Sequence, residues 1–188
     1  MARLLDRYKT EIQAELKSEL GIHNPLAVPR LQKVVVSMGT GSPMINKDRC
    51  ETVAGDLTQI AGQKAQICRA RKAVSNFKTR RGMSVGCRVT LRGKRMYEFM
   101  DRLINATIPR LRDFRGLDPR SFDGHGNYSF GLPDQSIFAE IDPVKVTINQ
   151  GMNITLVTSA KADAHARALL VKLGLPLRST EGRGESDN

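Results

Sequence analysis

Apolar residues recur at three- and four-residue steps in several stretches of the chain, the spacing that places them on one helix face. The first stretch predicts a helix over residues 2–20, closed by Gly21 at the position of a C-terminal cap. Asn46 and Ser159 stand where N-caps belong, and Pro109 is placed to kink or end a helix. Three more helices are predicted over residues 47–61, 94–112 and 160–173.

Alternating or β-branched apolar runs predict the strands. The clearest run covers residues 85–93, where small and apolar side chains alternate with Arg88, Thr90 and Arg92. Such a strand has one apolar face and one face of cations and a hydroxyl, which suits the phosphates and 2′-hydroxyls of RNA. The other predicted strands are residues 31–38, 65–68, 136–141 and 153–158, and the Gly-, Pro- and Asp-rich stretch before residue 136 is predicted to be mostly loop.

Positive charge is concentrated in residues 57–97. This stretch contains no Asp or Glu and eleven of the chain's 30 basic residues, and the other 19 basic residues balance 19 acidic ones. The whole net charge of +11 therefore belongs to this segment. Charge runs are usually solvated faces, but a long acid-free run interleaved with apolar residues favours a surface that binds a polyanion such as a phosphate backbone.

Part of the basic stretch has no clear period. Residues 69–82 mix cations with Phe77 and end in glycine, so we predict a long basic loop. Long loops in compact domains are uncommon and usually functional. We expect this loop to be mobile in the free protein and to become ordered on binding.

Catalytic and cofactor motifs are weak. The Gly-Thr-Gly at 39–41 lacks the third glycine of a dinucleotide-binding loop, so a glycine turn is the favoured interpretation. Asp113, Asp118, Asp123 and His125 could hold a metal for RNA hydrolysis, but their spacing fits no metal motif and Asp and Gly also form turns. No catalytic residue, metal site or cofactor is predicted.

Length and composition exclude other classes. A chain of 188 residues suits one domain, and no apolar run approaches the roughly 20 residues that span a bilayer. The charged, amphipathic N-terminus is unlike a secretory signal. Cys50, Cys68 and Cys87 are an odd number without a Cys-x-x-Cys pair, which favours a reduced cytosolic chain.

Several long motifs together resemble one family. They are VPRLQKVVVSMGTG, the GQK at 62–64, ARKAVSNFKTRRGMSVGCRVTLRG, IPRLRDFRGL, SFDGHGNYSFG and LGLPLR. The sequence closely resembles the bacterial family of large-ribosomal-subunit protein five, which binds 5S ribosomal RNA. The resemblance covers about residues 2–178, with the motifs in the same order and without large gaps. The specific RNA follows from this resemblance, because charge and periodicity alone do not distinguish one RNA from another.

The resemblance implies an α+β fold: a single domain over residues 1–178, mainly an antiparallel sheet with helices packed on one face and the long basic loop. Residues 179–188 are predicted to be a disordered polar tail. The implied place is the central protuberance of the large ribosomal subunit in the cytoplasm. Implied partners are 5S and 23S ribosomal RNA, the peptidyl-site transfer RNA, a small-subunit head protein across an intersubunit bridge, and other 5S-binding ribosomal proteins.

Site residues follow from the same resemblance, supplemented by charge. The predicted 5S-binding residues are Lys33, Ser37, Gln63, Lys64, Arg88, Thr90 and Arg92. The predicted transfer-RNA contacts lie in the loop and are Arg69, Arg71, Lys72, Ser75, Asn76, Phe77, Lys78, Arg80 and Arg81.

The sequence departs from the family pattern at two positions. Ser37 stands where the family typically has an asparagine that contacts RNA, and its hydroxyl can donate and accept with a shorter reach. His125 stands where arginine is usual, and a histidine is only partly charged at neutral pH. Two other functions stay open at this point: a metal-dependent RNA-processing hydrolase using the acids at 113–125, and an RNA chaperone or translational regulator outside the ribosome.

Overall fold

The chain folds around one five-stranded sheet. The computed structural model describes residues 3–41, 49–142 and 149–178, so predicted N-cap Asn46 and the predicted tail 179–188 lie outside the described residues. The strands are β1 (Leu31–Gly39), β2 (Gln66–Arg69), β3 (Ser84–Leu91), β4 (Tyr128–Leu132) and β5 (Met152–Thr158). Their order is β2-β3-β1-β5-β4, and every neighbouring pair is antiparallel.

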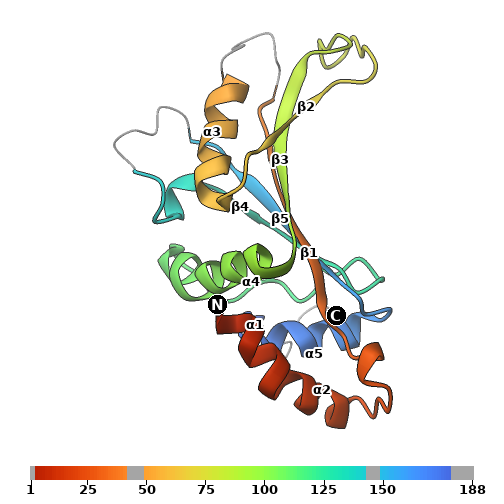
Figure 1. The fold of residues 1–188 in the computed structure, drawn as a ribbon. Helices are drawn as coiled ribbons and strands as arrows, with labels where there is room; N and C mark the ends of the chain where they lie inside the picture. Colours follow the sequence, from red (N-terminus) through yellow and green to blue (C-terminus); the bar gives the residue numbers. More distant parts are fainter. Residues whose placement is uncertain (1–2, 42–48, 143–148, 179–188) are drawn as a thin grey trace, which may run out of the picture.

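Helices occupy the ends and one side of this sheet (Figure 1). The helical segments are α1 (Arg3–Arg7), η1 (Tyr8–Ile12), α2 (Gln13–Glu19), η2 (Pro25–Ala27), α3 (Arg49–Ala61), α4 (Gly93–Arg102), η3 (Leu103–Thr107), η4 (Ile108–Arg110), η5 (Gln135–Ile137) and α5 (Asp163–Lys172). Figure 1 shows α3 and α4 on the same side of the sheet, with α1, α2 and α5 gathered near one end. The hairpin of β2 and β3 projects from the other end.

One face of the sheet carries the core. Val34, Val36 and Met38 of β1 are 0–1% exposed, and Val36 pairs directly with Val89 of β3 and Ile154 of β5. Side chains directly opposite in an antiparallel ladder share a face. The period-two alternation therefore collects the apolar side chains of three central strands into a single layer.

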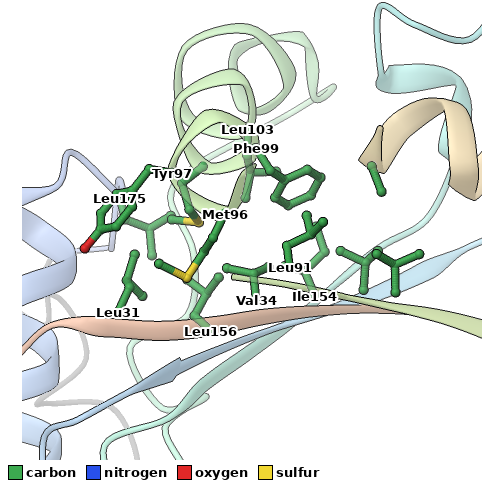
Figure 2. Packing of buried hydrophobic residues seen from close by; sticks show 14 of the residues in the cluster. Leu31, Val34, Leu91, Met96, Tyr97, Phe99, Leu103, Ile154, Leu156 and Leu175 are labelled. Carbon is green, nitrogen blue, oxygen red and sulfur yellow. The ribbon is translucent and has the colours of Figure 1, made fainter. Parts of the chain in front are cut away.

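Helix α4 packs on the apolar face of the sheet and covers this layer. Phe99 of α4 and Leu103 of η3 are 1% and 0% exposed. Phe99 lies over Leu91 and Ile154 of the sheet (Figure 2). Ion pairs tie the helices together: Arg3 of α1 pairs with Asp101 of α4 at 2.9 Å, and Lys172 of α5 pairs with Glu15 and Glu19 of α2 at 2.9 and 3.5 Å. These exposed ion pairs add little to the burial of the apolar layer.

Most predicted elements are confirmed. The helix predicted over 2–20 is a continuous helical run from Arg3 to Glu19, and Gly21 follows it with φ +63°. The helix predicted over 94–112 runs from Gly93 to Arg110 and narrows to a 3₁₀ turn around Pro109, as the missing N–H of proline requires. No helix in the described part of the chain is long and apolar enough to cross a membrane.

Two predictions about the second half are wrong, and one strand lies where none was predicted. Residues 136–141 do not form a strand: a 3₁₀ turn leads into a segment that buries Phe138 and Ile141. Strand β4 lies in the stretch predicted to be mostly loop. Ser159 is not an N-cap, because its hydroxyl accepts a hydrogen bond from the backbone N–H of Arg30, and α5 begins four residues later at Asp163.

Candidate nucleic-acid interface

The second face of the sheet is polar. Ser37 of β1 pairs with Arg88 of β3 on one side and with Asn153 of β5 on the other, and Arg88 pairs in turn with Gln66 of β2. These four side chains therefore form one row across four strands. Arg88 Nε donates to Oε1 of Gln66 at 3.4 Å, which holds the guanidinium along the row.

A second row runs parallel to the first. Thr90 of β3, Val35 of β1, Thr155 of β5 and Ser129 of β4 are successive partners in the register. The hydroxyl of Ser129 donates to Oγ1 of Thr155 at 3.0 Å. We call the two rows, together with Lys33 and Arg92 at their end, the open face.

No acidic residue interrupts the open face. None of the five strands contains Asp or Glu; the acids of the described residues all lie in helices and loops. Arg88, Asn153 and Ser129 are exposed, and the other row members from β1, β3 and β5 are partly exposed. The face therefore combines amides, hydroxyls and cations with no competing negative charge.

Gln63 and Lys64 lie beside this face rather than on it. Gln63 follows α3, and its Nε2 donates to the backbone oxygen of Thr90 at 3.3 Å. Thr90 lies in the part of β3 that extends past the end of β2, so it has no partner in β2. Its Oε1 accepts from Arg95 at 3.4 Å. Lys64 is exposed next to it. The structure thus brings together all seven residues predicted for 5S binding, five on the open face and two at its edge.

The predicted loop 69–82 extends the β2–β3 hairpin. Ala70 donates to the oxygen of Met83, Gly82 donates to the oxygen of Ala70, and Val74 and Thr79 exchange backbone hydrogen bonds at 3.1 Å. The segment is therefore an irregular, hydrogen-bonded continuation of the two strands. We call residues 69–82 the hairpin tip.

Side chains of the hairpin tip point into solvent. Phe77 is 72% exposed and Val74 is 41% exposed, and no residue of the tip is buried. Lys78 has φ +51°, the left-handed conformation that non-glycine residues seldom adopt, and its N–H closes a turn with the oxygen of Ser75 at 2.9 Å. All nine predicted transfer-RNA contacts lie together here, away from the helices in Figure 1.

Asp118 and Asp123, two of the candidate metal ligands in the sequence, form turns. Asp123 Oδ1 accepts from the backbone N–H groups of His125 and Asn127, and its Oδ2 accepts from the Asn127 amide. These bonds hold the pKa of Asp123 below its usual value. Asp118 accepts from the N–H of Arg120 in the same way. Within the described residues, no group of three His, Cys, Asp or Glu is arranged to hold a metal ion.

Sequence reasoning missed several open-face residues. The two rows are completed by Gln66, Asn153, Thr155 and Ser129, and none of these is among the predicted site residues. The signal was available for two of them, because Asn153 and Thr155 alternate with buried Ile154 in a predicted strand. Only the register, which sequence does not show, places them beside Ser37 and Val35.

Comparison with known proteins identifies the family. The family described as "Ribosomal protein L5" matches residues 24–80, and the "ribosomal L5P family C-terminus" matches residues 84–177. The first match contains β1 and β2 and the second contains β3, β4 and β5, so the single sheet is assembled from both.

Curated relatives match over nearly their whole length. The chain is 52% identical to the large ribosomal subunit protein uL5 of Syntrophus aciditrophicus over 179 residues, covering 95% of this chain and 100% of the relative. It is 54% identical to uL5 of Fervidobacterium nodosum over 175 residues, covering 93% and 95%. It is 51% identical to uL5 of Rubrobacter xylanophilus over 178 residues, covering 95% and 99%.

These matches confirm the resemblance seen in the sequence motifs. A structural protein of the bacterial ribosome is not an enzyme and works in the cytoplasm, so those two predictions are confirmed by family membership. Ribosomal RNA and ribosomal proteins are its general partners. On two family matches and relatives about half identical along nearly the entire chain, this protein belongs to the uL5 family of large-ribosomal-subunit proteins.

Proposed function

We propose that the open face binds 5S ribosomal RNA in the central protuberance of the large subunit. The observation that carries this proposal is the acid-free polar face itself, which spans all five strands and is backed by a buried apolar layer. Arginine forks suit phosphate oxygens, and serine, threonine and amide groups suit ribose 2′-hydroxyls. The face is therefore suited to recognise the backbone shape of a folded RNA.

The register sets the spacing of these contacts. Neighbouring strands lie about 4.8 Å apart, so Arg88, Ser37 and Asn153 present polar groups across about 10 Å. That span matches a few successive backbone groups and not a single base. Because Ser37 has a short side chain, the longer Arg88 and Asn153 on either side supply most of the reach of this row.

The hairpin tip carries the second part of the proposal. Its cations and exposed Phe77 would contact the peptidyl-site transfer RNA, and the protein would also bridge to a protein of the small-subunit head. Support comes from the exposed position of the tip at the end of a two-stranded projection, and from aromatic and cationic side chains that suit RNA bases and phosphates. Contacts with 23S ribosomal RNA and other 5S-binding proteins follow from the resemblance.

A competition experiment tests the 5S assignment. The purified full chain is titrated with 5S ribosomal RNA, a transfer RNA and an unrelated duplex of equal length over a range of salt concentrations. We expect a 5S preference of roughly a thousandfold at physiological salt, with log affinity falling by several units per log unit of salt. Equal affinity for all three RNAs would show that the face is only a general polyanion surface.

A cross-linking experiment tests the role of the tip. A photoreactive amino acid replaces Phe77 in one protein and the exposed Val171 of α5 in a control, and both are assembled into ribosomes carrying peptidyl-site transfer RNA. We expect cross-links to transfer RNA only from position 77. Equal cross-linking from both positions, or from neither, would contradict the assignment.

A further inference from the structure

A pocket lies where the N-terminal helix crosses the starts of β1 and α4. Its volume is about 410 Å³, within the range of about 300–1,000 Å³ typical of small-ligand sites. Lys9, Arg30 and Arg92 form its rim, and Tyr8, Met96 and Tyr97 line it more deeply. It thus combines an apolar interior with three exposed cations.

The rim cations differ from their neighbours. Arg3 and Arg7 of α1 do not line the pocket, and they pair with Asp101 at 2.9 Å and Glu11 at 3.5 Å. Lys9, Arg30 and Arg92 do line it, and none of the three has an acidic partner among the residues that the structure describes. Three unpaired cations around one concavity repel one another. Binding of an anion would neutralise this repulsion, so the pocket favours an anionic ligand.

Tyr97 supplies an unused donor inside the pocket. Only 5% of its surface is exposed, and its hydroxyl has no hydrogen-bond partner in the described part of the chain, whereas the hydroxyl of Tyr8 donates to the Pro29 oxygen at 2.8 Å. Figure 2 shows Tyr97 at the margin of the buried cluster. Burial raises the pKa of Tyr97 to about 12, so the O–H keeps its proton at neutral pH.

The start of α4 opens onto the same space. Arg92, the N-cap residue, makes no side-chain capping bond, and Gly93, with φ +57°, lines the pocket. The first N–H groups of a helix have no partner within it and carry partial positive charge. In this ten-residue helix they add to the field of the three rim cations.

We infer that this pocket holds one nucleotide of the RNA that lies on the open face. Its phosphate would sit between Arg30, Lys9 and Arg92, its ribose or base would pack over Met96, and the Tyr97 hydroxyl would donate to it. Arg92 belongs to both surfaces, so the RNA path continues from the open face around the end of β3 into the pocket. This inference rests on the proposed binding of 5S ribosomal RNA.

The test compares matched variants in binding to 5S ribosomal RNA. Arg30→Ala removes a rim cation, and Tyr97→Phe removes only the hydroxyl. Lys17→Ala is the control, because it removes an exposed cation of α2 that does not line the pocket. Thermal unfolding verifies that each protein is folded.

We expect Arg30→Ala to weaken binding about tenfold and to lower the salt slope by about one unit. Tyr97→Phe should weaken binding by about fivefold with an unchanged salt slope, because no charge is lost. Lys17→Ala should bind like the unmodified protein. Ethylation of the bound phosphate in the RNA should weaken binding of the unmodified protein more than binding of Arg30→Ala, which has already lost one of the three cations, and this coupling distinguishes an RNA phosphate from a free anion.

The outcomes separate this inference from the proposed function. If Arg30→Ala and Tyr97→Phe bind normally while an open-face variant, Arg88→Ala with Thr90→Val, loses affinity, the pocket is not part of the RNA site and the proposed function stands. If the unmodified protein shows no preference for 5S ribosomal RNA, the proposed function fails and the inference fails with it.

Discussion

The open face and the hairpin tip are both basic, yet they are built differently. The row residues of β1, β3 and β5 alternate with buried ones, so Arg88 and Ser37 are fixed by a ladder whose other side carries Val36 and Val89 at 0–2% exposure. The tip has no buried residue and is held mainly by backbone hydrogen bonds. A surface backed by a packed core is ordered before binding, while an unsupported projection loses conformational freedom when it binds.

From this difference we predict a division of labour. A preorganised face can recognise the shape of one folded RNA, because its groups keep a fixed spacing. A projecting tip suits a partner that arrives and leaves, because its side chains can adjust to it. Positive charge alone does not separate these roles; the packing behind the charge does.

The largest effect should come from Gly86, which lies in β3 at the base of the hairpin. A Cβ there would lie 2.5 Å from the backbone oxygen of Met38, so Gly86→Ala must push β1 and β3 apart beneath both surfaces. We expect a loss of about 3 kcal/mol in the free energy of unfolding by urea. Gly131→Ala is the matched control, because its Cβ would come closest to the movable Asn153 side chain at 3.3 Å and would meet the backbone oxygen of Met152 only at an ordinary contact distance of 3.9 Å. Equal urea midpoints for the two variants would contradict this account.

The next effect should come from the open face. The double variant Arg88→Ala with Thr90→Val removes a guanidinium from the first row and a hydroxyl from the second. It leaves the buried layer unchanged. We expect about a hundredfold weaker binding to 5S ribosomal RNA in a filter-binding titration, and unchanged unfolding. Lys17→Ala controls for loss of a remote cation. A loss of RNA affinity below about threefold, which is what removing any exposed charge would cause, would contradict a special role for the open face.

Cysteine reactivity distinguishes the two faces of the sheet. Cys68 shares the open side of β2 with Gln66 and is partly exposed, whereas Cys87 is 2% exposed on the apolar side. Burial raises the pKa of the Cys87 thiol to about 12, so its reactive thiolate is scarce up to pH 9. Iodoacetamide at pH 8 should alkylate Cys68 more than tenfold faster than Cys87.

The same reaction reports on RNA. Bound 5S ribosomal RNA should slow alkylation of Cys68 and leave Cys87 unchanged, as measured by mass spectrometry of the labelled peptides. Rapid alkylation of Cys87 in the folded protein would contradict its burial. An unprotected Cys68 at saturating RNA would place the RNA away from the β2 side of the face.

The smallest effect should come from the tip. Arg71→Ala, Lys72→Ala and Arg80→Ala together remove three exposed cations that lie beyond the end of the paired strands. We expect affinity for 5S ribosomal RNA to fall by less than about threefold, because none of them lies on the rows of the open face. Cross-linking of the tip to peptidyl-site transfer RNA should be lost in the same variant. Loss of 5S binding would show that the two surfaces do not act separately.

The sequence predicted the central sheet better than its periphery. Strands β1, β3 and β5 are long, and their alternation between buried and open residues has period two, so their faces could be assigned. Strand β4 has only five residues and follows Gly124 and Gly126. The surrounding turn-forming residues made the alternation of Tyr128, Phe130 and Leu132 difficult to recognise in the sequence. Its place is set by pairing with β5, which is a tertiary contact.

The two other errors have the same origin. Residues 136–141 contain enough apolar side chains to suggest a strand, but Phe138 is buried against α4, where its ring stacks on that of Phe99 with the ring centroids 6.1 Å apart. Ser159 resembles a cap, but it bonds to the start of β1. Asp163, at the true start of α5, accepts from the N–H of Gly126 at 2.8 Å across the fold.

The site was predicted in part for a physical reason. Cations of the basic stretch are visible in the sequence, so charge alone points to Arg88 and Arg92, whereas the contacts predicted for the tip follow from the family resemblance. Neutral members of the rows are ordinary polar residues until the register places them in a row with an arginine: Gln66 lies directly beside Arg88, and Asn153 lies on the far side of Ser37 from it. The pocket of Lys9, Arg30 and Tyr97 depends on contacts between three distant segments and has no local signal.

Mapping of ultraviolet cross-links in the complex with 5S ribosomal RNA tests the central claim most directly. Peptides that carry cross-linked nucleotides are identified by mass spectrometry at saturating RNA and physiological salt. The division of labour predicts cross-links on β1, β3 and β5, at or beside Ser37, Arg88 and Asn153, with few on residues 71–81. Cross-links confined to residues 71–81, with the strands unmarked, would contradict it.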